Sequence, residues 1–143
     1  MKRVLAILFV VSAPCALAET ILVDPGATHM FVGDKFDART AQEVLYEARP
    51  CKLPIVNAKD MRQYTTTTMA KPMEACWGRT LGGGVTQIFE NGMSLQVTEN
   101  AYVAASVDGS GFGVVTKSIY ERRNYQPCTE ADKNGRMCLK GQH

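Results

Sequence analysis

The sequence predicts a small, mainly β domain, an antiparallel meander or partly closed barrel that is stapled by disulfides. Apolar and polar residues alternate after Asn91-Gly92, and an apolar segment precedes this pair, which is the pattern of a β-hairpin. Two further apolar segments flank the glycine-rich stretch 108–111, and the run 64–68 is rich in β-branched residues. One short N-terminal helix is also expected, so α+β is the alternative class.

The first 18 residues have the composition of a signal peptide. Lys2 and Arg3 precede an apolar run at 4–11, and small residues at 16–18 suit a signal peptidase. The apolar run is much shorter than the roughly 20 residues that a membrane-spanning helix needs. We therefore expect an exported protein, in the periplasm or outside the cell, with no transmembrane segment after cleavage.

Cleavage after residue 18 leaves two regions, a β-rich domain at 19–116 and a polar C-terminal extension with a disulfide loop at 117–143. Lipidation of Cys15 is the alternative for the leader. It is disfavoured because Pro14 stands where lipidated cysteines normally follow a small residue.

Loss of the leader changes the charge. The whole chain has 16 Lys plus Arg and 14 Asp plus Glu, and removing Lys2 and Arg3 leaves 14 of each, a net charge of zero. A balanced charge gives no electrostatic reason to bind nucleic acid.

The cysteine count falls from five to four, namely Cys51, Cys76, Cys128 and Cys138. An even number in an exported chain indicates a disulfide framework, and four cysteines allow three connectivities. Pairing of neighbours in sequence, Cys51 with Cys76 and Cys128 with Cys138, is preferred because these loops are shortest. The crossed pairings remain alternatives.

Residues 38–48 repeat apolar side chains at helical spacing between Asp37, a helix-capping residue type, and Pro50. This favours a helix, and a strand over 44–48 leading into Cys51 is the alternative. Elsewhere we expect extended segments at 20–23, 29–32, 64–68, 73–78, 85–89, 93–98, 102–107 and 112–116.

The hairpin around Asn91-Gly92 is the strongest local signal, because this pair tolerates the positive φ angles of a type I′ turn. Met93, Leu95 and Val97 alternate with polar residues and predict one buried face. Trp77 follows Cys76 directly, so in a strand the two side chains point to opposite faces.

Catalytic motifs are weak. The stretch 109–113 resembles G-x-S-x-G but has its serine in the wrong place, and the cysteine spacings contain no C-x-x-C zinc pattern. Glu90, Glu99 and Asp108 lie near expected strand ends, where two of them would serve a glycosidase if they converged. Solvated acids occupy the same places, so we expect a protein that is not an enzyme, with no cofactor and no metal.

The order Arg49-Pro50-Cys51, a polar loop, Ala75-Cys76-Trp77, a strand and Asn91-Gly92 resembles small secreted proteins of proteobacteria and their phages, which share a P-C, C-W, D/N-G order. The resemblance covers about 44–103. It implies a small β domain with a Cys51–Cys76 disulfide and implies no activity.

The stretch 106–112, followed by Thr116-Lys117-Ser118, is similar to bacterial inhibitors of C-type lysozymes. Those are exported β-barrels that present a serine and a lysine in nearby loops to the lysozyme cleft. This likeness implies that Ser106 or Ser110, with Lys117, would contact a partner.

The expected function is therefore that of an exported non-enzymatic accessory or binding protein of the bacterial cell envelope. The alternative is a periplasmic inhibitor of a lysozyme-type cell-wall hydrolase. The expected partner is an envelope protein or a lysozyme, and the sequence leaves the oligomeric state open.

Overall fold

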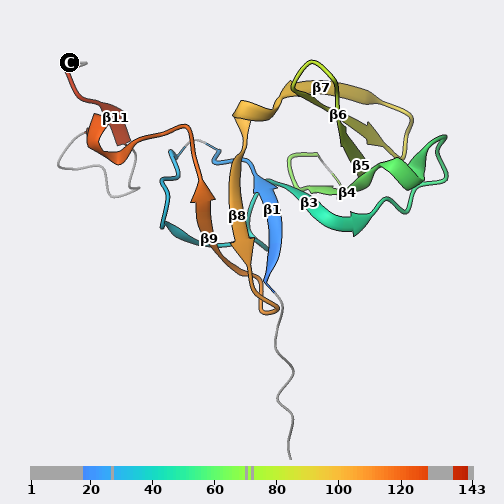
Figure 1. Cartoon of the computed structure of the whole chain (residues 1–143), viewed down its shortest axis with the longest axis horizontal. Helices are drawn as coiled ribbons and strands as arrows, with labels where there is room; N and C mark the ends of the chain where they lie inside the picture. The colour runs from blue at the N-terminus through green and yellow to red at the C-terminus, as the bar shows by residue number, and fades with distance from the viewer. Residues whose placement is uncertain (1–17, 27, 70, 72, 129–136, 142–143) are drawn as a thin grey trace, which may run out of the picture.

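A computed structural model describes residues 18–26, 28–69, 71, 73–128 and 137–141. The predicted signal peptide, with Cys15, lies outside these residues except for Ala18. The chain is mainly β, as predicted, and forms an open, bent antiparallel sheet of nine strands and a separate two-stranded sheet (Figure 1). The described sheet does not close into a barrel, so the meander describes it better.

The strands are β1 (Glu19–Val23), β2 (Lys35–Asp37), β3 (Glu43–Pro50), β4 (Arg62–Thr66), β5 (Met73–Arg79), β6 (Gly84–Phe89), β7 (Ser94–Thr98), β8 (Val103–Val107), β9 (Phe112–Lys117), β10 (Tyr125–Pro127) and β11 (Met137–Leu139). Three single 3-10 turns are η1 (Ala58–Asp60), η2 (Glu99–Ala101) and η3 (Arg122–Asn124). The large sheet has the order β2-β9-β8-β1-β3-β4-β5-β6-β7. The meander therefore runs from β3 to β7, and the chain then returns to pair β8 with β1.

The predicted helix at 38–48 is wrong, and its strand alternative is correct. β3 pairs with β1 on one side and with β4 on the other, and these pairings outweigh a weak helical pattern. Val44 and Leu45 are both buried, on opposite faces of the sheet. Residues 29–32, expected to be extended, form no strand, and β2 lies just after them.

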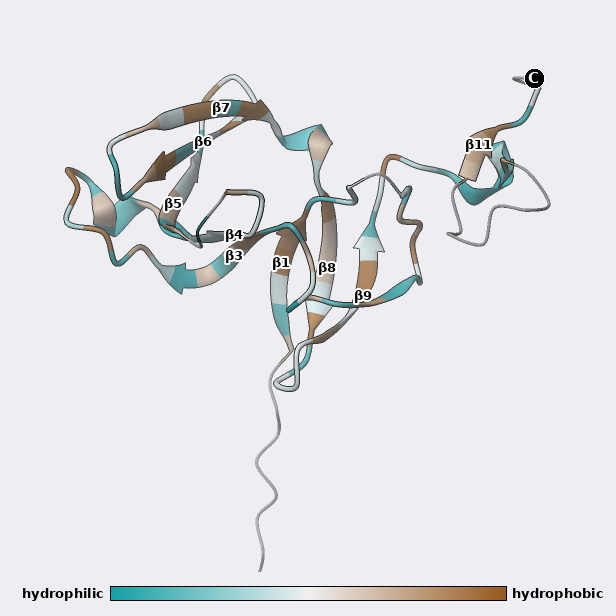
Figure 2. Ribbon diagram, turned by 180° about the vertical axis from the view of Figure 1, so that it is seen from behind, coloured by the Kyte–Doolittle hydropathy of each residue, from teal (hydrophilic) through white to brown (hydrophobic). Residues whose placement is uncertain are grey.

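Two apolar cores lie on opposite faces of the sheet. One contains Leu22, Leu45, Tyr64, Ala75, Trp77, Val85, Phe89 and Tyr102. The other contains Ile21, Val23, Val44, Val103, Ala105, Val107 and Val115. β1 contributes to both cores, and its apolar part lies between β3 and β8 (Figure 2). An unbroken apolar strand such as β1 is typical of a position covered on both faces.

Both predicted hairpins form, but the turn at Asn91-Gly92 is not type I′. Only Gly92 has a positive φ, of 83°, and Asn91 does not. The Gly92 amide donates to the Phe89 carbonyl at 2.9 Å, and the Phe89 amide donates to the Met93 carbonyl at 2.9 Å. These bonds define a three-residue loop, a type I turn followed by a glycine bulge. The predicted buried face of β7 is partial, since Leu95 is 41% exposed.

Both preferred disulfides, Cys51–Cys76 and Cys128–Cys138, are present. The first joins β5 to the segment after β3, and Cys76 and Trp77 are each 1% exposed. The second joins Cys128, directly after β10, to Cys138 in β11, so the C-terminal extension is pinned by its own disulfide as expected.

The C-terminal extension packs on the N-terminal loop through aromatic rings. His29 lies between Tyr120 and Tyr125, with ring centroids 4.5 Å from each. The rings of Tyr125 and Phe31 also form a T-shaped contact, and Arg122 forms an ion pair with Asp34. These contacts attach the two-stranded sheet to the rest of the protein.

Candidate functional site

A cleft of about 450 Å³ lies between the strands β1, β8 and β9 and the segment formed by β3, β5 and η2. Strands β1, β3, β5, β8 and β9 all contribute to its walls. Its lining residues are Leu22, Glu47, Arg79, Gly83, Glu99, Asn100, Tyr102, Ala104, Lys117, Ser118 and Ile119. The volume falls in the range of about 300–1,000 Å³ that is common for binding sites.

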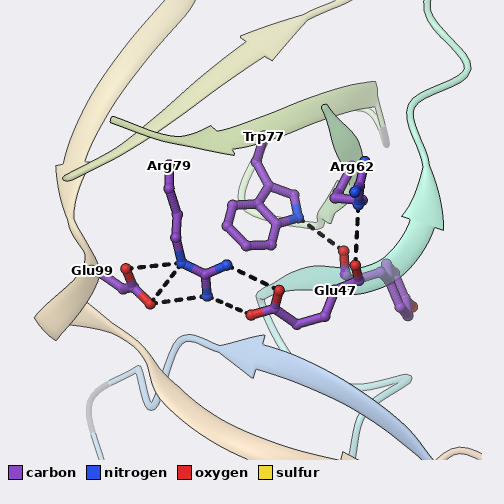
Figure 3. A network of polar contacts seen from close by, with 6 residues as sticks. Glu47, Arg62, Trp77, Arg79 and Glu99 are labelled. Atoms are coloured by element: carbon purple, nitrogen blue, oxygen red, sulfur yellow. Dashed lines mark hydrogen bonds and ion pairs between the residues drawn. The ribbon is translucent and has the colours of Figure 1, made fainter. Parts of the chain in front are cut away.

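The local fold of β3 places Glu47 at this cleft. Between the pairs Leu45 with Tyr64 and Pro50 with Arg62, the β3–β4 register shifts, so carbonyls of β3 lose their strand partners. The Trp77 indole N–H donates to the freed Tyr46 carbonyl at 3.1 Å. The Arg62 Nε donates to the Glu47 carbonyl at 3.2 Å, and Figure 3 shows both bonds.

Arg79 bridges two carboxylates across the cleft (Figure 3). Its Nη2 donates to Glu47 Oε1 at 2.5 Å and to Glu99 Oε1 at 3.0 Å. Its Nη1 donates to Glu47 Oε2 and its Nε to Glu99, each at 3.1 Å. Arg79 lies two residues after Trp77 on the same face of β5, with its guanidinium 5.0 Å from the centroid of the indole ring.

The bridge favours the charged form of Arg79. Hydrogen bonds from Arg79, first to Glu47 and then to Glu99, raise the pKa of the guanidinium above its ordinary value. The Arg79 side chain is 46% exposed, so water screens the network, and we expect it to contribute only about 1 kcal/mol to stability. Through these bonds Arg79 of β5 links Glu99 of η2 to Glu47 of β3 across the cleft.

Tyr102 lines the cleft, and its hydroxyl is bound by the buried Gln87 and the half-buried Glu43. The Gln87 amide donates to the Tyr102 hydroxyl at 2.5 Å, and this hydroxyl donates to Glu43 at 2.7 Å. Burial, then the hydrogen bond with Glu43, raises the pKa of Tyr102 above its ordinary value. The phenol therefore stays neutral at physiological pH and serves as a structural group.

Lys117 is the predicted contact residue that lines this cleft. It is the last residue of β9, is exposed, and forms no ion pair with any described residue. Ser118, beside it, also lines the cleft, and its hydroxyl donates to the Met30 carbonyl at 2.7 Å. Sequence reasoning named Lys117 and missed Ser118, although the two are adjacent in the chain.

The other two predicted contact residues lie away from Lys117. Ser110 is in the β8–β9 turn, at the opposite end of β9, and six strand residues span about 17–20 Å. Its hydroxyl donates to Asp108 at 2.6 Å, and it lines a separate cleft together with Arg39 and Arg49. Ser106 lies within β8, half-buried, paired with Val114. The structure therefore brings neither serine to Lys117.

The three carboxylates considered for hydrolysis do not converge either. Glu90 and Glu99 lie at opposite ends of β7, and Asp108 follows β8 at its far end from Glu99. Glu99 binds Arg79, and Asp108 accepts the Ser110 hydroxyl, which holds the pKa of Asp108 below its usual value. The two carboxylates that do face each other, Glu47 and Glu99, are both bound to a guanidinium, an arrangement suited to binding and positioning.

Across the described residues, no three histidine, cysteine or acidic side chains gather as metal ligands would. The same part of the chain contains no helix with the length and apolar character needed to cross a bilayer. Comparisons with family models, curated proteins and solved structures find no match for this chain.

Proposed function

We propose that this chain is an exported, non-enzymatic binding protein of the bacterial envelope that engages a protein partner at the Arg79–Lys117 cleft. The observation that carries the proposal is that the acidic side chains of this cleft are paired with Arg79, whereas its lysine is not paired with any described residue. Glu47 and Glu99 are occupied by Arg79, whereas Lys117 is exposed and has no described ion-pair partner. Among the residues that line the cleft, Lys117 is therefore the cation available to a partner, and it suits an acidic group on the partner's surface.

Export is supported by the sequence of the leader and by the disulfides. Two disulfides in a chain of 143 residues are typical of proteins that fold in oxidising compartments. Small domains bury a limited fraction of their surface, so disulfides add stability that the apolar cores of such a domain do not supply alone.

Inhibition of a lysozyme-type hydrolase is the second candidate, and Lys117 is the observation that favours it. Enzymes of this class cleave glycosides with two carboxyl groups in a cleft, so an exposed lysine complements the charge of the site. The position of Ser110 at the far end of β9 means that Ser118, rather than Ser110, would accompany Lys117 in such a contact.

The test compares Lys117→Ala with Lys59→Ala, a matched loss of an exposed lysine outside the cleft. Oxidised protein from Glu19 to His143 is immobilised and exposed to envelope extract and, separately, to a C-type lysozyme. We expect capture of a specific protein that is reduced at least tenfold by Lys117→Ala and unchanged by Lys59→Ala, with both variants melting at the wild-type temperature. If lysozyme is the bound protein, its hydrolysis of cell walls should fall in the same proportion.

Equal capture by wild type and Lys117→Ala would contradict the proposal that this cleft is the binding site. Capture of envelope proteins without lysozyme would support the accessory role and reject the inhibitor. Hydrolysis of a glycan substrate by the purified wild-type chain would contradict the non-enzymatic assignment.

A further inference from the structure

Among the described residues, the edge strands β2 and β7 of the nine-stranded sheet each pair on one side only, and the two edges differ in character. The β2 edge is three residues long and carries Lys35 and Asp37, and short charged edges resist pairing with other chains. The β7 edge, Ser94–Thr98, is five residues long and contains no charge, no proline and no glycine. Natural proteins usually protect such an edge, so its exposure points to a pairing partner.

The register shows which backbone groups of β7 are free. The Phe89 amide donates to the Met93 carbonyl at 2.9 Å, so backbone groups at Met93 face β6. In an antiparallel ladder this orientation alternates along the strand, and every second residue directs its N–H and C=O away from the neighbour. The outward groups therefore belong to Ser94, Gln96 and Thr98.

We propose that β7 pairs in antiparallel fashion with β7 of a second copy of this chain, about a two-fold axis at Gln96. In this register Gln96 faces its own counterpart and Ser94 faces Thr98, so the outward backbone groups meet each other. Three such pairs, with two bonds each, give about six backbone hydrogen bonds. Leu95 of one copy faces Val97 of the other, which pairs two apolar side chains.

A second copy fits this edge better than an arbitrary strand, because the strand is complementary to itself in both hydrogen bonding and polarity. Leu95 is 41% exposed and would be covered by the pairing. The flanking Glu99 is already bound to Arg79, so its charge is compensated at the new interface. A two-fold contact also closes on itself, and the charged β2 edge gives no route to a continuing fibre.

The test exploits the self-facing position of Gln96, which is exposed on β7. Gln96→Lys and Gln96→Glu each place like charges opposite each other across the axis, whereas a mixture places opposite charges there. Sedimentation velocity from about 5 to 500 μM is measured for wild type, for each variant and for their equimolar mixture. We expect a reversible wild-type dimer, several-fold weaker association of each variant alone, and recovery in the mixture by about tenfold over either variant.

Thr116→Lys is the matched control, since it adds the same charge at an exposed position on β9. It should leave the dimer unchanged. Wild type that stays monomeric across this range overturns the proposal, as would happen if β7 bound only the strand of another protein. A dimer that is equally strong in Gln96→Lys, Gln96→Glu and Thr116→Lys also overturns the proposal, because the contact between the copies would then lie elsewhere.

Discussion

Loss of the Cys51–Cys76 disulfide should cost the protein far more stability than loss of Cys128–Cys138. The first closes a loop with a sequence separation of 25 and the second a loop of 10. In the chain-entropy model these loops stabilise the folded state by about 3.5 and 2.7 kcal/mol, so their lengths alone predict similar effects. The difference comes from position, because only the first joins parts of the large sheet.

The assay is thermal unfolding followed by the fluorescence of Trp77, the only tryptophan, which is 1% exposed in the large sheet. At about 4 °C per kcal/mol for a domain of this size, Cys51→Ala with Cys76→Ala should lower the melting temperature by about 10–15 °C. Cys128→Ala with Cys138→Ala should lower it by less than about 3 °C, since its loop lies in the separate β10–β11 sheet. Equal losses in the two double variants would refute this reasoning.

Two further predictions concern the β8–β9 hairpin. A Cβ added at Gly113 would lie 2.7 Å from the Phe36 ring, so Gly113→Ala should lower the free energy of unfolding, measured in urea, by about 1–3 kcal/mol. A Cβ at Gly82 would have no atom within 4 Å, so Gly82→Ala should change this free energy by less than about 0.5 kcal/mol. Similar losses for both variants would show that the close contact at Gly113 is absent. The Ser110 hydroxyl lowers the pKa of Asp108, so this carboxylate should stabilise the hairpin above about pH 4 and lose that effect as the pH falls through its lowered folded pKa. An NMR titration that finds the Asp108 pKa at or above about 3.9 would contradict the turn geometry.

Local patterns in the sequence predicted the strands well where polar and apolar residues alternate next to turn residues. They failed at 38–48, because alanines, Val44 and Leu45 at helical spacing fit a strand equally well when both neighbouring strands supply partners. They also misjudged the Asn91-Gly92 turn, since Glu90 joins the loop and leaves Asn91 with a negative φ. Loop length, which depends on strand register, decides the turn type.

The cleft was only partly accessible to sequence reasoning. Lys117 was identified, but Arg79 binds partners that lie 32 and 20 residues away in the chain, and no spacing rule connects them. The bridge depends on the irregular β3–β4 pairing that turns Glu47 into the cleft and on η2, which carries Glu99. Both are consequences of tertiary pairing.

The cleft and the free β7 edge arise from the same step in the topology. After β7 the chain does not add β8 to the edge of the meander but crosses through η2 to pair β8 with β1. This crossing covers β1 on its second side and brings Glu99 to Arg79, which shapes the cleft. It also leaves β7 with unpaired backbone groups. Glu99 lines the cleft and directly follows β7, so a partner in the cleft and a second copy at β7 would bind next to each other. The binding of each should therefore be measured in the presence of the other.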